Sequence, residues 1–300
     1  MFTNKEMLAG VIRKRLDGIG TPKFKCLLDH PSQWKGVIKA ALEMRLDSPW
    51  LIRQARSSLC GPTVFMQVLA EKCPAIYVTY IFDLIEHGKA TIGGLHIKPS
   101  RSCMNWHARL SNGAGSAMDP IEAVDWIALA SLRDSENSLF NYDQESDQFA
   151  GITLPGGLES WFKKVDLFRT VDRKTNIVFD KGLNNFLRAA SAAQSGSKVC
   201  LFLGSKVFSL EHFPGKGKVP ADHWAIMAER ENITIGGDSI PMVINKLNTE
   251  GEKYRDGLYD KRVRFSCQTW GIKAYPIDIA RKPLALSEFL DFYYGFIIVR

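Results

Sequence analysis

The chain has 300 residues, of which 45% are hydrophobic, 24% charged and 11% aromatic, a composition typical of a globular protein with a substantial core. It contains no low-complexity stretch and no repeat of fixed period, which excludes fibrous and solenoid proteins. The net charge of +7 favours an anionic partner. The basic residues are nevertheless spread along the chain and no nucleic-acid-binding motif is present, so no sequence-specific nucleic acid is expected as a partner.

The first half of the chain is predicted to be mainly helical. Apolar residues recur at helical spacing over 33–46, and another helix is expected to start at Cys60, where Pro62 occupies the first turn. Pro74 restarts the helical pattern, which ends at Gly88, a predicted C-cap. The other elements expected in this half are a loop or hairpin over 89–118 and helices after Asp119-Pro120, after Pro155-Gly156-Gly157 and over 180–194.

From residue 198 onwards the pattern changes to short runs of β-branched and aromatic residues separated by turns. The runs are predicted as strands over 198–204, 223–229, 232–237, 261–275 and 293–300. Helices followed by strands indicate an α+β fold, because an α/β fold would alternate the two. We expect a single domain over 1–300 with two lobes. They are a mainly helical lobe over 1–195, including an amino-terminal extension over 1–48, and a β-rich lobe over 196–300.

The six cysteines show no short paired spacing, which argues against both a disulfide framework and a zinc site. Cys103 and His107 have a spacing that some metal sites use, but no second pair accompanies them. We therefore expect no metal and no cofactor. Cys60 is the one cysteine whose surroundings indicate chemistry.

Three short segments contain the residues of a cysteine-nucleophile active site. Cys60 lies at a predicted helix start, which lowers the pKa of a thiol, and Gln54 precedes it by six residues. His223, at the beginning of a predicted strand, would accept the proton of Cys60 and later return it to the leaving group. Gln268 would orient the imidazole through its side-chain carbonyl oxygen. The amide of Gln54 and the backbone N–H of Cys60 would donate hydrogen bonds to the oxyanion.

These segments resemble the motifs of papain-like cysteine peptidases. That family has Gln six residues before the nucleophile, often Asp-His-Ala at the histidine strand, and Asn-Ser-Trp-Gly at the orienting position. The corresponding segments here are Gln54 to Gly61, Asp222 to Ala225 and Gln268 to Gly271.

The resemblance implies a papain-like fold with its active site in the cleft between a helical and a β-rich lobe. By the same match Gln54, Cys60, His223 and Gln268 take the oxyanion, nucleophile, base and orienting roles. Trp270 takes the role of the indole that covers the hydrogen bond between the histidine and the orienting amide.

The sequence departs from the family at three points. Gln268 stands where the family has Asn and is one methylene longer. Asp238 is therefore an alternative orienting residue, and Asp222 is either an ion-pair partner or a turn residue. The interval of 45 residues between His223 and Gln268 is longer than the family usually shows, which predicts an inserted loop or excursion over 230–260. The Cys-Gly-Pro helix start is more similar to bacterial branches, including transporter-linked peptidases and secreted effectors.

Two groups of charged residues have simpler interpretations. Gly215 to Lys218 is predicted to form a basic lip of the cleft beside His223. The other group is predicted to be a solvated helix face and consists of Asp125, Asp134, Glu136 and Asp143.

The resemblance implies a thiol hydrolase that cleaves an amide bond in a protein or a peptidoglycan peptide. The same residues also suit an acyltransferase or a glutamine deamidase, and the altered orienting residue suits a catalytically inactive scaffold that binds a partner.

The amino terminus has no signal-peptide pattern and no apolar run is long enough to span a membrane, so we expect synthesis in the cytoplasm. The basic charge and the Cys-Gly-Pro start favour a bacterial effector or toxin exported by a specialised secretion system. Its partner would be a neutralising protein or a component of the secretion apparatus.

Overall fold

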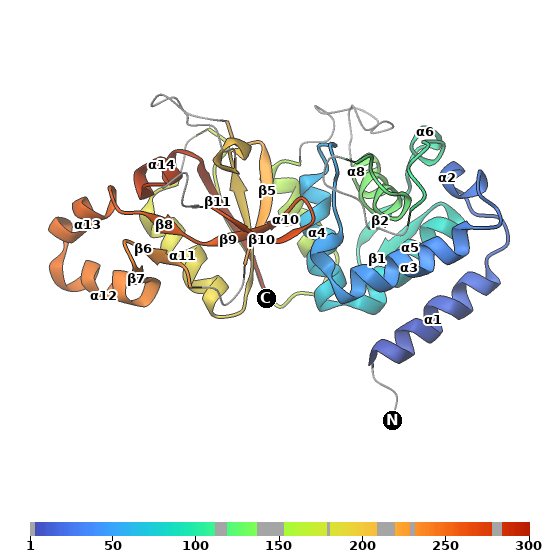
Figure 1. Ribbon diagram of the computed structural model, residues 1–300, viewed down its shortest axis with the longest axis horizontal. Helices are drawn as coiled ribbons and strands as arrows, with labels where there is room; N and C mark the ends of the chain where they lie inside the picture. The colour runs from blue at the N-terminus through green and yellow to red at the C-terminus, as the bar shows by residue number, and fades with distance from the viewer. Residues whose placement is uncertain are drawn as a thin grey trace. The chain divides into compact units, whose positions relative to one another are not determined.

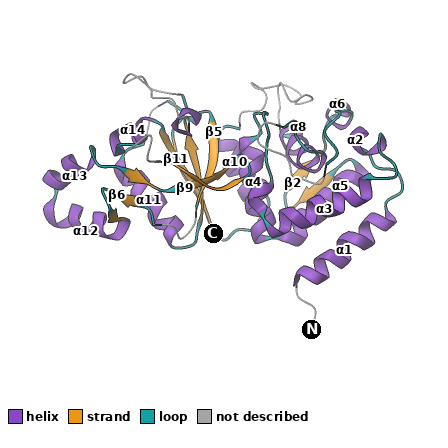
Figure 2. Cartoon of the chain, in the orientation of Figure 1, coloured by secondary structure: helices purple, strands orange, loops and turns teal. Residues whose placement is uncertain are grey.

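A computed structural model describes residues 4–111, 119–136, 153–178, 181–208, 220–228, 232–277 and 284–300. The chain divides into two compact units, 1–167 and 168–300, and each is described by itself. The first unit is mainly helical and the second contains a large sheet together with helices (Figure 2). The predicted class, a mixture of helices and strands of the α+β kind, is confirmed.

The first unit is built around α4 (Cys60–Lys72), whose residues from Cys60 to Ala70 are all buried. A helix that is buried on every side needs apolar residues on every side, which this sequence supplies. The helix α5 (Pro74–His87) begins at Pro74 as predicted and ends at Gly88, which has a left-handed φ of 67°. The backbone N–H of Gly88 donates to Leu84, a C-cap that glycine forms without steric cost.

The segment predicted as a loop or hairpin contains an antiparallel hairpin of β1 (Ala90–Ile92) and β2 (Leu95–Ile97). The helix expected after Asp119-Pro120 is present as α7, a π-helical segment and α8. The remaining elements of the unit are α1 (Asn4–Gly18), α2 (Lys25–Leu28), α3 (Trp34–Asp47), a 3-10 turn (Pro49–Leu51), α6 (Arg101–Met104), α7 (Ala123–Asp125), the π-helical segment (Trp126–Ala130), α8 (Ser131–Ser135) and α10 (Pro155–Lys164).

The second unit contains an antiparallel six-stranded sheet of order β10-β9-β5-β4-β11-β3. Its strands β5, β9, β10 and β11 are labelled in Figure 1. Three of its four inner strands, β5, β4 and β11, are buried along their whole length. The helix α11 (Leu183–Gln194) packs on this sheet, and Phe186 of α11 contacts Phe265, Phe289 and Tyr293. The strands of the sheet are β3 (Val171–Thr175), β4 (Lys198–Leu203), β5 (His223–Met227), β9 (Ser266–Thr269), β10 (Ile272–Pro276) and β11 (Tyr293–Val299).

The boundary between the units lies at Leu167, earlier than the boundary near residue 195 that the sequence predicted. The strand β3 pairs with β11 over five residues, and α11 contributes buried apolar residues to the core of the same unit. The sequence prediction missed β3 because its residues, Val-Asp-Arg-Lys-Thr, are mostly polar. A polar strand at the edge of a sheet is common, since charged side chains protect the edge from further pairing.

The predicted excursion over 230–260 is folded in its described part, from residue 232 onwards. It begins with a hairpin of β6 (Thr234–Ile235) and β7 (Asp238–Ser239), and β8 (Val263–Arg264) completes a small sheet of order β7-β6-β8. Two helices that the sequence analysis did not predict, α12 (Ile240–Glu250) and α13 (Glu252–Leu258), lie between β7 and β8. The remaining elements of the unit are a 3-10 turn (Ser205–Phe208) and α14 (Leu286–Asp291).

Candidate active site

Cys60 is the first residue of α4 and its side chain is buried. At this position the positive end of the helix dipole favours thiolate over thiol. Cys26 also lies in the first turn of a helix, α2, but burial raises its pKa to about 12, as it does for Cys200 in β4. None of the six cysteines is joined in a disulfide.

Gly61, the second residue of α4, lies in close contact with Thr153, a buried residue just before α10. A Cβ at position 61 would overlap the side chain of Thr153, so only glycine fits. This explains the Cys-Gly pair physically: the glycine lets the chain before α10 approach the turn that carries the thiol.

Gln54 belongs to a stretch that is held against the same helix. The amide nitrogen of Gln67, on α4, donates to the carbonyl oxygen of Ile52 at 2.8 Å. The carbonyl oxygen of Gln54 accepts from both the backbone N–H and the hydroxyl of Ser57, and Ala55 has a left-handed φ of 54°. These contacts fix the position of Gln54 with respect to the helix that begins at Cys60.

The side chain of Gln54 is 8% exposed, and its Oε1 is buried without a hydrogen-bond partner among the described residues. Which end of an amide is oxygen is assigned from its surroundings. In either assignment, a buried polar end of this side chain has no partner among the residues that the structure describes. Such groups are uncommon in folded proteins and often mark a functional position.

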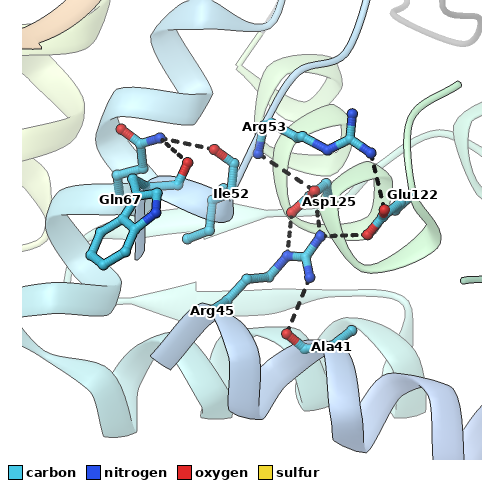
Figure 3. A network of polar contacts seen from close by, with 8 residues as sticks. Ala41, Arg45, Ile52, Arg53, Gln67, Glu122 and Asp125 are labelled. Atoms are coloured by element: carbon cyan, nitrogen blue, oxygen red, sulfur yellow. Dashed lines mark hydrogen bonds and ion pairs between the residues drawn. The ribbon is translucent and has the colours of Figure 1, made fainter. Parts of the chain in front are cut away.

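A buried ion-pair network supports the stretch before Gln54 (Figure 3). The guanidinium of Arg45 donates two hydrogen bonds to Asp125, of 2.8 and 2.7 Å, and a third to Glu122 at 2.7 Å. Arg53 donates to Glu122 at 3.0 Å through its guanidinium, and its backbone N–H donates to Asp125. Although burial acts to raise the pKa of Glu122, the two arginines outweigh it and lower that pKa. Arg53 therefore fixes the chain immediately before Gln54.

The prediction that Asp125 lies on a solvated helix face is wrong, because its side chain is completely buried and paired with Arg45. Asp134 is also mostly buried and accepts a hydrogen bond from the backbone N–H of Ser100. Glu136 accepts from the indole of Trp161 and pairs with Lys164. Asp143 lies outside the described residues. The error arises because a charged residue on a helix is usually solvated unless a distant part of the chain supplies its partner.

His223, in the second unit, is 4% exposed and begins β5. Its Nε2 lies 2.8 Å from the hydroxyl oxygen of Thr269, and no described residue forms a hydrogen bond with its Nδ1. Burial lowers the pKa of His223 to about 3, so the imidazole is neutral at pH 7. In the tautomer whose Nε2–H donates to Thr269, the neutral ring can accept a proton at Nδ1.

The indole of Trp270 stacks on the imidazole of His223, with ring centroids 4.6 Å apart and planes inclined by 20°. Trp270 and Gly271 form the two-residue turn between β9 and β10, with φ values of 50° and 79°. A positive φ is strained for a bulky residue, and such strain concentrates at functional sites. Phe208 and Tyr275 contact the edge of this stack, so that aromatic rings surround the hydrogen bond between His223 and Thr269.

Gln268 does not take the orienting position that the sequence predicted. It pairs with Ile226 across β5 and β9, and side chains along a strand alternate between the two faces. His223 is three residues from Ile226, so its side chain is on the opposite face from Gln268. Thr269, one residue further along, is on the same face as His223 and forms the hydrogen bond. Counting residues along the Gln-Thr-Trp-Gly hairpin places Thr269 on the same face as His223 only when the pairing of β5 with β9 is known. That pairing is set by the tertiary structure.

The two aspartates considered beside His223 have other partners. Asp222 accepts hydrogen bonds from the backbone N–H and the hydroxyl of Ser205, at 2.6 and 2.8 Å, and so holds the turn that carries Phe208. Asp238, in the excursion, accepts from Lys246 and Tyr254, and it is not a partner of His223. The predicted basic lip, Gly215 to Lys218, lies outside the described residues.

Within the described ranges, no group of three or more His, Cys, Asp and Glu side chains is arranged to hold a metal ion. Over the same ranges, no helix combines the length and the apolar character needed to cross a membrane.

Comparison of the chain with protein-family models, with curated proteins and with solved structures finds no match.

Proposed function

We propose that this protein is a cysteine-dependent hydrolase that cleaves an amide bond in a protein or a peptidoglycan peptide. The observation that carries the proposal is the imidazole of His223, which is held at Nε2 by Thr269 and covered by Trp270. In the first unit Cys60 at a helix start and the nearby Gln54 provide the complementary groups. The proposal requires the two units to present Cys60 and His223 to each other, as the lobes of a papain-like fold do.

The proposed reaction begins when Nδ1 of His223 accepts the proton of the Cys60 thiol, while its Nε2–H donates to Thr269. The thiolate attacks the carbonyl carbon, and the resulting oxyanion accepts hydrogen bonds from the amide of Gln54 and the backbone N–H of Cys60. The intermediate collapses, the leaving amine takes the proton from His223, and a thioester remains on Cys60. A water molecule that His223 deprotonates then hydrolyses the thioester and restores the thiol.

The low pKa of His223 sets a condition on this mechanism. An imidazolium in so buried a position is unfavourable, so transfer of the proton needs the thiolate charge close by to stabilise it. The helix dipole at Cys60 acts in the same direction, because it stabilises the thiolate. The two groups are thus expected to titrate as a pair.

Thiol alkylation tests the proposal. The purified protein is treated with iodoacetamide at pH 7, and each cysteine is followed by peptide mass. Cys73 is the most exposed of the six cysteines, so labelling governed by exposure would reach Cys73 first. An activated thiolate predicts that Cys60 reacts faster than Cys73 by roughly tenfold or more. It also predicts that His223→Ala removes this advantage while the rate at Cys73 stays unchanged.

The burial of Cys60 and the low pKa of His223 also fit the inactive scaffold. In that case Cys73 is labelled first and His223→Ala does not change the rate at Cys60. That result would contradict the enzyme proposal and leave a binding protein. If Cys60 is activated, protein and peptidoglycan substrates are incubated with the wild type and with Cys60→Ser. A product that only the wild type releases identifies the amide bond that is cleaved. Ammonia release or transfer to an added amine would instead identify a deamidase or an acyltransferase.

A further inference from the structure

The excursion between the strands of His223 and Thr269 contains a pocket of about 460 Å³. Its lining residues come mainly from the β6–β7 hairpin, the end of α12 and α13, and Figure 1 labels these elements. This volume is within the range of small-molecule sites, which is roughly 300–1,000 Å³.

Apolar groups form the inner wall of the pocket. Ile235 and Leu258 are buried behind this wall, and the partly buried Tyr254 lines it. Gly236 lies in the hairpin turn with a φ of 64°, a conformation that favours glycine, and Gly257 has open space where a Cβ would be. A ligand with an apolar body can therefore contact the ring of Tyr254 and the backbone at Gly257.

A preorganised carboxylate faces the pocket. Lys246 and Tyr254 both donate to Oδ2 of Asp238, each at 2.8 Å, and no described residue forms a hydrogen bond with Oδ1. The two hydrogen bonds lower the pKa of Asp238, so the group is ionised at neutral pH. Asp238 thus has one oxygen held by the protein and one available to a donor from the pocket.

Three further charged side chains line the same pocket, namely Glu250, Lys253 and Lys261. Among the described residues, none of the three forms an ion pair, although they carry opposite charges. The pocket therefore offers an acceptor for an ammonium group at Asp238 and Glu250, and donors for a carboxylate at Lys253 and Lys261. A ligand with only one kind of charge would use only half of these groups.

We propose that the hairpin–helix pocket binds a small zwitterion with an apolar body, such as an amino acid or a short peptide. The ammonium group of the ligand binds Asp238 and Glu250, its carboxylate binds Lys253 and Lys261, and its apolar part contacts the ring of Tyr254 and the backbone at Gly257. This site is separate from the residues of the proposed hydrolase and does not depend on that proposal.

Calorimetric titration of the full chain with four matched probes tests the site. L-leucine and the dipeptide leucyl-leucine carry both charges, at different separations. The analogue 4-methylpentanoate carries only the carboxylate, and 3-methylbutylamine carries only the ammonium. We expect one of the zwitterions to bind saturably, with a Kd of roughly millimolar or below, and at least about tenfold more tightly than either single-charge analogue. If L-leucine binds more tightly than leucyl-leucine, the ligand is a free amino acid, and if leucyl-leucine binds more tightly, it is a peptide.

Variants then assign the groups. Glu250→Gln and Lys253→Gln remove charges without disturbing an internal contact, and each is expected to weaken zwitterion binding by roughly tenfold. Asp238→Asn is expected to act in the same direction. Because it also loosens the contacts with Lys246 and Tyr254, the first two variants decide the result. Asp256→Asn is the matched control, since it removes an exposed charge from α13 outside the pocket and should bind as the wild type does. The proposal is overturned if no zwitterion binds more tightly than both analogues, or if Glu250→Gln and Lys253→Gln bind like the control.

Discussion

At the scale of single residues, Thr269 and Gln268 provide a direct comparison, because neighbouring side chains in β9 point to opposite faces. Thr269→Val keeps the shape but removes the hydroxyl, which leaves Nε2 of His223 buried without a partner. We expect a loss of about 1–3 kcal/mol of unfolding free energy and a slower reaction at Cys60. Gln268→Met removes a polar group from the other face and should change neither quantity appreciably.

Chemical denaturation and the alkylation assay measure the two effects. If Gln268→Met, and not Thr269→Val, slows the reaction of Cys60, then Gln268 is the orienting residue and our register argument is wrong. The comparison therefore separates the orienting role from a general effect of mutating β9.

The buried His223 also predicts a pH dependence of stability. Its pKa is about 6.5 in an unfolded chain and about 3 in the folded protein, so folding favours the neutral ring. The stability that the neutral ring contributes is fully present above pH 6.5 and is lost as the pH falls towards 3. Over that window we expect the wild type to lose up to about 1.4 kcal/mol per pH unit more than His223→Gln. Urea denaturation of both proteins at pH 7, 6, 5 and 4 measures the difference, and parallel curves would contradict the buried neutral ring.

At the scale of elements, Gly61 lets Thr153 pack against the start of α4. Gly61→Ala places a Cβ against Thr153 and is expected to cost about 1–3 kcal/mol of unfolding free energy. Gly36→Ala is the matched control, because Gly36 lies on the exposed side of α3 with open space around it. That substitution should stabilise the protein by about 0.5–1 kcal/mol. Thermal unfolding of the two variants should therefore shift in opposite directions, and a shift of the same sign would refute the packing argument.

The ion-pair network joins α3 and α7 to the stretch before Gln54. Arg45→Met leaves Glu122 and Asp125 buried with one arginine fewer, and we expect a cost of about 3–5 kcal/mol. Lys39→Met on the same helix breaks an exposed pair with Glu43 and should cost less than about 1 kcal/mol. Equal losses of unfolding free energy in the two variants would show that the buried network contributes no more than a surface pair.

At the scale of the whole molecule, the boundary between the units can be tested with fragments. Residues 168–300 retain β3 and α11, including Phe186, which contacts three aromatic side chains of the sheet core. A fragment of 196–300, cut at the predicted boundary, lacks both elements. We expect cooperative urea unfolding and dispersed amide resonances from 168–300 and not from 196–300. Similar behaviour of the two fragments would contradict the division at Leu167.

The sequence alone determined those features that depend on local chemistry. Proline and glycine set the ends of α5, and apolar periodicity together with Pro62 indicated a helix starting at Cys60. The runs of β-branched and aromatic residues located the buried strands β4, β5 and β11, because such strands need apolar side chains on both faces. These signals act over a few residues, so they can be read without the fold.

The tertiary structure decided the features that depend on distant partners. Asp125 appeared solvated until Arg45, 80 residues away along the chain, supplied its counter-charge. Thr269 replaced Gln268 beside His223 because the pairing of β5 with β9 sets the face on which each side chain lies. A polar strand such as β3 becomes part of the sheet only when β11 offers its edge. In each case the energy comes from a contact between segments that the sequence places far apart, and no local pattern encodes it.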